Sequence, residues 1–210
     1  MQLILASNSP RRKELLTLLS LSFEVCPSEF HEQITVGLPP LEQCKQFALE
    51  KARSVAKIHP KAYVLGSDTV IDLDGHTLGK PRDRDDARVM LGVLAGRSHH
   101  VHTAVALINS ERRHEVVEVA TAAVQMKPDK GQLYERYLTS GEWFGKAGSY
   151  AIQGLGGDLV KQIEGDYTAV VGLPLKLVAD LLRLASYPVS VNVKALYQQK
   201  LYANWNRFMV

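Results

Sequence analysis

The sequence lacks the features that would place it outside ordinary globular proteins. Its 210 residues include only two cysteines, Cys26 and Cys44, and neither has a Cys or His at zinc-finger spacing. A disulfide framework is therefore excluded, and two unpaired thiols are typical of a reducing compartment. No apolar run approaches the length of a membrane-spanning helix, and residues 1–7 lack the charged start and long apolar stretch of a signal peptide. We therefore expect a cytoplasmic protein with no membrane partner.

Several common catalytic patterns are also missing. Segment 141–147 is one residue short of a Walker phosphate loop, and no Ser or Thr follows Lys146. Ser7 and Ser9 do not lie in a Gly-x-Ser-x-Gly elbow, so a serine hydrolase has little support. Three histidines have no Cys or acid at ligand spacing, which favours strand positions over a metal site: His99, His100 and His102.

The composition indicates one soluble unit that is large enough to bury a substantial core. Hydrophobic residues make up 46% of the chain and charged residues 22%, close to the averages for globular proteins. The net charge of +3 is an excess that can serve an anionic ligand. The basic residues are dispersed and no basic motif is interleaved with aromatics, so no stable nucleic-acid partner is expected.

Hydrophobic patterning in the first half predicts an α/β fold. Strand-like and helix-like runs alternate, which is typical of layered sheets flanked by helices. The predicted strands are 3–6, 22–26, 63–65 and 70–73, and the predicted helices are 11–19, 41–56 and 85–94.

The second half predicts antiparallel pairing, so the whole sheet is expected to be mixed. Two β-rich runs, 103–108 and 116–126, are joined by a polar segment and predict a hairpin. Further along, the predicted elements are a helix over 129–138, a glycine-rich loop over 145–157, a second hairpin pairing 158–163 with 167–171, and a helix from Pro174 to Leu184. The tail 186–210 ends in aromatic residues and has no assigned role.

A cluster of polar and basic residues stands between the first strand and the first helix. Ser9 suits an N-cap and Pro10 suits the first helical position, so a well-formed helix start is one interpretation. Arg11, Arg12 and Lys13, however, place three cations at the positive end of the helix dipole, each disfavoured by about 0.3–1 kcal/mol when exposed. Because helix N-termini after strands bind phosphate readily, we favour an anion site here.

Two ionisable residues occupy positions that usually hold apolar side chains. Lys51 falls on the inward stripe of its predicted helix, where it either extends past the helix edge or points into a cleft. Asp68 interrupts a strand-forming run and, if buried, needs a cation, a metal or several donors. The alternative for Asp68 is a turn between two strands.

Two further charged residues, Lys80 and Glu32, are candidates for the same site. Pro81 forces Lys80 into an extended conformation and so gives its side chain a definite direction, although a surface lysine before a turn is the commoner pattern. Glu32 alone is typical of a solvated loop acid. Paired with Asp68 it can hold Mg²⁺ or Mn²⁺, because hard cations prefer carboxylate oxygens and share their sites with phosphates.

Taken in order, these segments resemble the Maf family of nucleoside triphosphate pyrophosphatases over residues 1–185. The matching segments are Ala6-Ser7-x-Ser9-Pro10-Arg11-Arg12-x-x-Leu15-Leu16, Glu32, Glu50-Lys51-Ala52, Gly66-Ser67-Asp68-Thr69-Val70, Gly79-Lys80-Pro81, Ala147-Gly148-x-Tyr150-x-Ile152-Gln153-Gly154 and Val171-Gly172-Leu173-Pro174. The resemblance implies an elongated mixed sheet flanked by helices, of the Maf and ITPase type, with a cleft between two lobes.

The resemblance also implies roles for individual residues. Asp68 would be the catalytic residue that activates water for attack on the α-phosphorus, and Glu32 and Asp68 would hold a divalent metal cation, Mg²⁺ or Mn²⁺. The triphosphate would be surrounded by Ser7, Arg12, Lys51 and Lys80. The family usually has Asp-Glu where this chain has His31 before Glu32, so one metal-binding carboxylate is replaced.

Three positions distinguish the branches of the family by their nucleobase. Arg11, Thr69 and Gln153 resemble the branch that hydrolyses dTTP and UTP, whereas the branch acting on 7-methylguanosine triphosphate has tryptophan, glutamine and glutamate there. An alternative function is a nucleotide-binding regulator of cell division without turnover, a role also associated with the family. A homodimer is the default expectation for the assembly.

Overall fold

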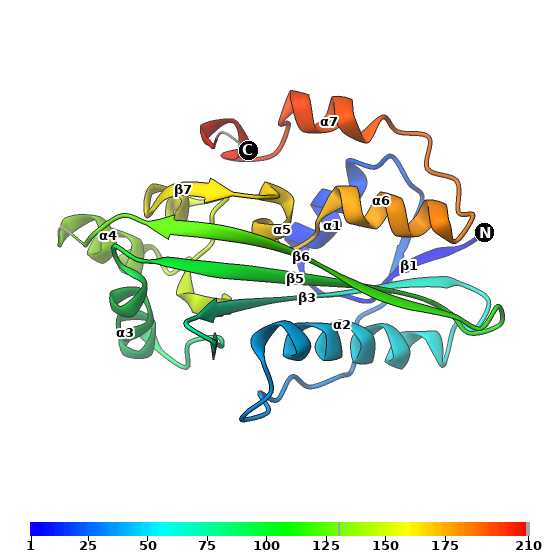
Figure 1. Ribbon diagram of the computed structural model, residues 1–210, viewed down its shortest axis with the longest axis horizontal. Helices are drawn as coiled ribbons and strands as arrows, with labels where there is room; N and C mark the ends of the chain where they lie inside the picture. Colours follow the sequence, from blue (N-terminus) through cyan, green and yellow to red (C-terminus); the bar gives the residue numbers. More distant parts are fainter. Residues whose placement is uncertain (130, 209–210) are drawn as a thin grey trace.

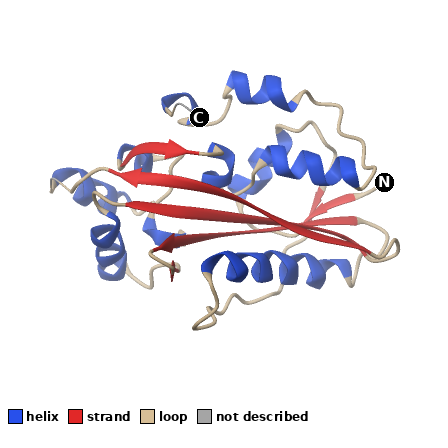
Figure 2. Cartoon of the chain, in the orientation of Figure 1, coloured by secondary structure: helices blue, strands red, loops and turns tan. Residues whose placement is uncertain are grey.

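A computed structural model describes residues 1–129 and 131–208 and confirms the α/β fold with a mixed sheet. The strands form one twisted sheet with helices around it (Figure 2). Among the described residues, its seven strands follow the order β2-β1-β3-β5-β6-β7, with β4 paired to β3. Strand β1 runs parallel to β2 and β3, and the other pairs are antiparallel. The strands are β1 (Leu3–Leu5), β2 (Glu24–Val25), β3 (Tyr63–Leu73), β4 (His76–Leu78), β5 (Ser98–Asn109), β6 (His114–Met126) and β7 (Val160–Glu164).

Helices cover both faces of this sheet. In Figure 1, α2 lies along one face, α6 and α7 lie over the other, and α3 and α4 stand at one end. The helices are α1 (Pro10–Thr17), α2 (Pro40–Ala56), α3 (Arg84–Leu94), α4 (Gln132–Ser140), α5 (Tyr167–Val171), α6 (Leu175–Leu184) and α7 (Val193–Gln199), with short 3-10 turns η1 (Ala147–Ser149), η2 (Leu155–Asp158) and η3 (Trp205–Arg207).

The alternation of side chains along each strand divides the interior into two hydrophobic cores. Successive side chains of a strand point to opposite faces of the sheet. Accordingly, Ile4 and Val64 join the smaller core beneath α2, whereas Leu5 and Leu65 join the larger core on the opposite face. Even-numbered residues at the start of β3 therefore face α2, and odd-numbered ones face away from it.

Strand β3 is longer than the sequence predicts. The runs 63–65 and 70–73 belong to one continuous strand, so the alternative that Asp68 lies in a turn is wrong. The break in hydrophobicity at residues 66–68 reflects the site described below and not a turn. The predicted hairpin of β5 and β6 is confirmed, with twelve paired positions from Ser98 to Asn109.

The second predicted hairpin is wrong. Residues 167–171 form helix α5 instead of a strand, because Asp166 caps this segment by accepting a hydrogen bond from the Thr168 backbone N–H at 2.7 Å. The apolar run of this short segment does not distinguish a buried helix from a strand. Strand β7 therefore pairs only with β6 among the described residues. Position 130 of the predicted helix 129–138 lies outside the described residues.

The arrangement of partners along β3 leaves its middle open. Strand β1 pairs with residues 63–65 and β4 pairs with residues 71–73 on the same side of β3. Between them, residues 66–70 pair only with β5 within the described chain. The chain thus forms a gap in the sheet edge at Asp68. No helix in residues 1–129 and 131–208 has the length and apolarity that a membrane crossing requires.

Candidate functional site

A cleft of about 870 Å³ opens at the middle of β3. Its walls come from the β1–α1 turn, the loop before α2, α2 itself, the end of β4 and the glycine-rich segment after α4. All nine residues singled out from the sequence line this cleft, although they are far apart in the chain: Ser7, Arg11, Arg12, Glu32, Lys51, Asp68, Thr69, Lys80 and Gln153.

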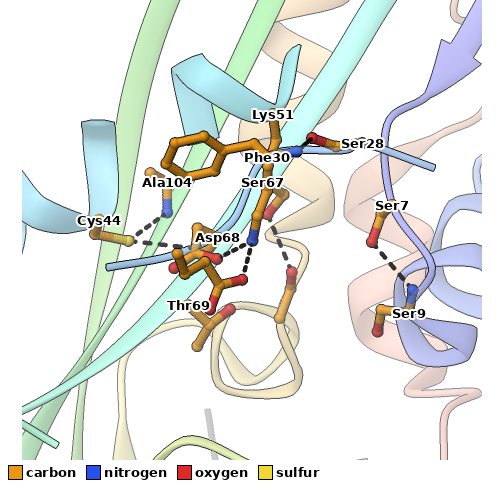
Figure 3. A network of polar contacts seen from close by, with 12 residues as sticks. Ser7, Ser9, Ser28, Phe30, Cys44, Lys51, Ser67, Asp68, Thr69 and Ala104 are labelled. Carbon is orange, nitrogen blue, oxygen red and sulfur yellow. Dashed lines mark hydrogen bonds and ion pairs between the residues drawn. The ribbon is translucent and has the colours of Figure 1, made fainter. Parts of the chain in front are cut away.

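The β1–α1 turn differs in one detail from the predicted helix start. Ser9 occupies the N-cap position, but its side chain makes no capping hydrogen bond, so the predicted side-chain cap is wrong. The hydroxyl of Ser7 accepts instead from the Ser9 backbone N–H at 3.1 Å (Figure 3) and from Arg12 Nη1 at 3.4 Å. The turn is therefore organised around Ser7, and the N-terminal end of α1 lies in the cleft wall.

Arg12 is held by residues from two distant segments. Its Nε donates to the Gly172 carbonyl at 2.9 Å, and its Nη2 donates to Thr69 Oγ1 at 3.3 Å. Gly172 has φ +124°, a conformation that L residues rarely adopt, and a Cβ there would lie 3.3 Å from Thr69 Oγ1. The Gly172 carbonyl also accepts from Ser67 Oγ at 3.2 Å. Gly172 is thus a positioning residue whose contact with Arg12 no local sequence pattern predicts.

The side chain of Lys51 points into the cleft and does not extend past the edge of its helix. Its side chain extends from α2 to Asp68, with which it forms an ion pair, and both residues are buried (Figure 3). Asp68 follows Val64 and Gly66 on the face of β3 that packs against α2, as the alternation of the strand requires. A Cβ on Gly66 would lie 2.4 Å from the Ala48 carbonyl, so glycine there allows α2 to approach the strand.

Glu32 completes a chain of alternating charges across the cleft. One carboxylate oxygen accepts from Lys51 Nζ at 2.6 Å and the other from Lys80 Nζ at 2.7 Å. Partial burial alone would raise the pKa of Glu32, but the two ammonium groups outweigh it and lower the pKa to about 2. Glu32 is therefore ionised at neutral pH and links the two lysines, unlike an isolated loop acid.

Burial changes the ionisation of two other groups in the cleft. Burial raises the pKa of the Asp68 carboxyl, against the opposing effects of Lys51 and Arg12. Burial also lowers the pKa of Arg11, and the adjacent Arg12 adds to this effect. The Arg11 Nε is buried and has no hydrogen-bond partner within the described residues. The site thus holds a carboxylate suited to accepting a proton and a guanidinium whose buried donor lacks an acceptor.

Cys44 supports the strand directly behind Asp68. Its thiol lies within hydrogen-bonding distance of the carbonyls of Asp68 at 3.3 Å and His102 at 3.2 Å, and it accepts from the Ala104 backbone N–H at 3.2 Å. Burial raises the pKa of this thiol to about 12, so it remains protonated at neutral pH. Both cysteines are free, as expected. No local sequence pattern predicts this contact of Cys44 with the strand.

Lys146 is a further cleft residue that motif matching did not identify. It lies beside Gly145 in the wall of the cleft, and burial together with the charge of Arg11 lowers its pKa. Its ammonium donates to the Phe144 carbonyl at 3.3 Å. The incomplete Walker pattern around Lys146 does not indicate that this lysine lies in the same cleft as Arg12.

The residues of the cleft fit a hard divalent cation with a small protein ligand set. The Lys51 ammonium lies between the carboxylates of Glu32 and Asp68, and so occupies a position where two anionic oxygens already converge on one cation. The described residues contain no group of three or more His, Cys, Asp and Glu side chains that could hold a metal alone. Two carboxylates are enough for Mg²⁺, which usually completes its shell with waters and substrate phosphates.

Comparisons with known proteins identify the family to which the chain belongs. Residues 2–185 match the family model described as Maf-like protein. The dTTP/UTP pyrophosphatase of Gloeobacter violaceus is 48% identical over 86% of this chain and 94% of its own length. The proteins of the same name from Bacillus pumilus and Ruminiclostridium cellulolyticum are 44% and 41% identical, over 83% and 86% of this chain and 91% and 94% of theirs. The chain therefore belongs to the Maf-like protein family.

Proposed function

We propose that this protein is a nucleoside triphosphate pyrophosphatase that hydrolyses dTTP and UTP to the nucleoside monophosphate and pyrophosphate. The observation that carries the proposal is the convergence of cationic side chains on the buried carboxylate of Asp68 in one cleft. Relatives that are 41–48% identical over most of the chain have the printed name dTTP/UTP pyrophosphatase. A polyanionic substrate and a proton acceptor are the two requirements that this site meets.

The triphosphate would replace ion pairs that the protein makes with itself. In the structure, Lys51 and Lys80 are neutralised by Glu32 and Asp68. Phosphate oxygens would compete for these ammonium groups. Arg12 and the Ser7 hydroxyl would bind further phosphate oxygens at the N-terminus of α1. A divalent cation held by Glu32 and Asp68 would neutralise phosphate charge. Phosphoryl transfer depends mainly on such positioning and charge stabilisation, so no covalent nucleophile is required.

Asp68 would act as the base for the attacking water. The water oxygen forms a bond to the α-phosphorus, its proton passes to the Asp68 carboxylate, and the bond from the α-phosphorus to the bridging oxygen breaks. Pyrophosphate then leaves with the electron pair of that bond. Burial raises the pKa of Asp68, which brings it closer to the range in which a carboxylate can take up a proton at neutral pH.

Nucleobase selection would depend on Arg11, Thr69 and Gln153. The amide of Gln153 offers both a donor and an acceptor, which matches the edge of a pyrimidine base. A wrong base would leave polar groups unpaired in the cleft, and this raises the barrier for that substrate. Arg11 lines the cleft and would offer guanidinium donors for such a contact.

A cytoplasmic location and a homodimeric state belong to the same proposal. A substrate drawn from the nucleotide pool places the protein in the cytoplasm, where its two thiols would stay reduced. A symmetric dimer is the commonest assembly of soluble proteins, and size-exclusion chromatography with light scattering would test it. We propose no stable nucleic-acid partner, because the basic residues are dispersed along the chain and no basic motif is interleaved with aromatics.

The test is a phosphate-release assay with added inorganic pyrophosphatase, using canonical and modified nucleoside triphosphates with Mg²⁺ or Mn²⁺. We expect hydrolysis of dTTP and UTP by the wild type, and a loss of about a hundredfold or more in kcat for Asp68→Asn with little change in nucleotide affinity. The matched control is Asp72→Asn, the same substitution on the same strand at a residue outside the cleft wall. Binding of nucleotides without any turnover would instead support a regulator.

A further inference from the structure

The C-terminal segment beyond the family match packs against the site-bearing part of the fold. The family model ends at residue 185, and the described segment 186–208 contributes buried side chains to the larger core. Figure 1 shows α7 and the final turn returning over α5 and α6 toward β7. Trp205 is 1% exposed and stacks on Tyr167 of α5 with ring centroids 5.6 Å apart. The described part of the tail is thus packed into the hydrophobic core of the protein.

Asn204 of this tail contacts the backbone on both sides of Gln153. Its Nδ2 donates to the Ile152 carbonyl at 2.8 Å and to the Gly154 carbonyl at 3.0 Å. Its Oδ1 accepts from Arg207 Nη1 at 3.3 Å, which determines the orientation of the amide. The carbonyl groups of the residues before and after Gln153 are therefore both bound by one side chain that lies beyond residue 185, where the family match ends.

The local backbone is arranged to bring this amide to the loop. Asn204 has φ 62° and ψ −4°, in the left-handed region that asparagine tolerates better than most residues. A Cβ on Gly157 would lie 2.7 Å from Asn204 Nδ2, so the glycine leaves room for the amide. Both the conformation of residue 204 and the glycine facing it suit the two hydrogen bonds.

Other tail residues contact the neighbouring site elements. Arg207 Nη2 donates to Asp158 at the end of η2 at 2.7 Å. The Tyr202 hydroxyl donates to Glu14 at 2.7 Å, and Glu14 lies one turn along α1 from Arg11. The segment from 202 to 207 therefore contacts both the loop that carries Gln153 and the helix that carries Arg11. Gln153 and Arg11 are two of the three residues proposed to select the nucleobase.

We propose that residues 202–207 form a specificity strap, and that Asn204 is a positioning residue that fixes Gln153 against the nucleobase. This inference rests on the proposed function of Gln153 as a selector. Recognition through hydrogen bonds requires donors and acceptors held within a fraction of an ångström, and a misplacement of about 1 Å can cost about a hundredfold. A loop rich in glycine does not supply that rigidity alone, since its backbone has many accessible conformations. The strap supplies it from outside the loop.

The experiment compares three single variants of the full-length protein with the wild type. Asn204→Gly retains the left-handed backbone without strain and deletes the amide. Asn204→Asp retains the shape but turns a carboxylate toward two carbonyl oxygens. Asn192→Ala is the matched control, because it removes the side-chain cap of α7, which accepts from the Ala195 N–H at 3.1 Å, without touching the Gln153 loop.

We expect both Asn204 variants to raise KM for UTP and to lower its kcat/KM advantage over a purine triphosphate by about tenfold, with kcat for UTP much less affected. Asn192→Ala should keep the wild-type KM and selectivity. Unchanged KM and selectivity in both Asn204 variants would overturn the proposal, and so would equal changes in Asn192→Ala.

Hydrogen exchange separates this inference from the proposed function. Backbone amides of residues 151–158 should exchange faster in Asn204→Gly than in the wild type, while those of α2 should not change. Equal exchange of residues 151–158 in the two proteins would refute the strap, whatever the enzyme activity. A wild type that exchanges slowly there but hydrolyses no nucleotide would refute the proposed function and the selectivity role, and would leave only the mechanical contact.

Discussion

Replacement of Lys51 by methionine tests the charge arrangement of the cleft most directly. Methionine retains most of the length and apolar area of the lysine stem but removes the ammonium group. That group lies between the carboxylates of Asp68 and Glu32, and the whole residue is only 8% exposed. The variant therefore leaves the buried Asp68 carboxylate without its nearest cation, whereas Glu32 retains Lys80 at 2.7 Å.

The expected loss of stability in Lys51→Met follows from this difference between Asp68 and Glu32. Removing one partner of a buried ion pair costs about 3–5 kcal/mol in the free energy of unfolding, because a charge remains unpaired. Since Glu32 retains a partner and Arg12 also acts on Asp68, we expect the lower end, about 3 kcal/mol. For a chain of this length each kcal/mol corresponds to about 2–4 °C, so Tm should fall by about 6–12 °C.

Thermal melts followed by circular dichroism, supported by urea titrations, measure this loss. Lys45→Met is the matched control on the same helix, because Lys45 forms an exposed pair with Glu42 and should lose no more than about 1 kcal/mol. In an Asp68→Asn background, Lys51→Met should cost at least about 1 kcal/mol less than in the wild type. Equal losses in the two backgrounds would refute the assignment of the penalty to Asp68.

Three further predictions concern other parts of the structure. Gly66→Ala should destabilise the protein by about 1–3 kcal/mol and reduce kcat, because the new Cβ would push α2 from β3; urea denaturation and the phosphate-release assay measure both effects. Gln153→Glu should shift the substrate profile away from UTP, and an unchanged profile would remove Gln153 from base selection. Burial lowers the pKa of His99 to about 4, so the unfolded state binds the proton more readily and stability is lost as pH falls below about 6.5. Between about pH 7 and about pH 5, this group should lower the free energy of unfolding of the wild type by about 2 kcal/mol. Urea midpoints measured over this pH range should lack that part of the acid dependence in His99→Asn.

Local sequence patterns predicted most elements of the fold, and their errors have physical causes. The interruption at Gly66 and Asp68 comes from tertiary contacts and not from a turn, since the glycine lets α2 approach the strand and the aspartate pairs with Lys51. Residues 167–171 are too short and too uniformly apolar for periodicity to distinguish a helix from a strand. The cap at Asp166, which decides in favour of the helix, is a single side-chain hydrogen bond.

The sequence by itself determined which chemical groups are available for a site. Residue type and spacing along the chain predicted an anion site at the first helix start, and they identified the charges Lys51 and Asp68 at positions that usually hold apolar residues, together with the family, because these depend on local patterns. Their joint placement in one cleft was implied only by resemblance.

Only the tertiary structure decided how those groups act on one another. The link of Lys51 to Asp68 and Glu32, the anchoring of Arg12 by the Gly172 carbonyl, and the contact of Asn204 with the Gln153 loop join residues that are 17 to 160 positions apart. Such contacts depend on how the strands pair and where helices and the tail pack on the sheet. Residue types limit which contacts can form, but the folded chain determines which of them do form.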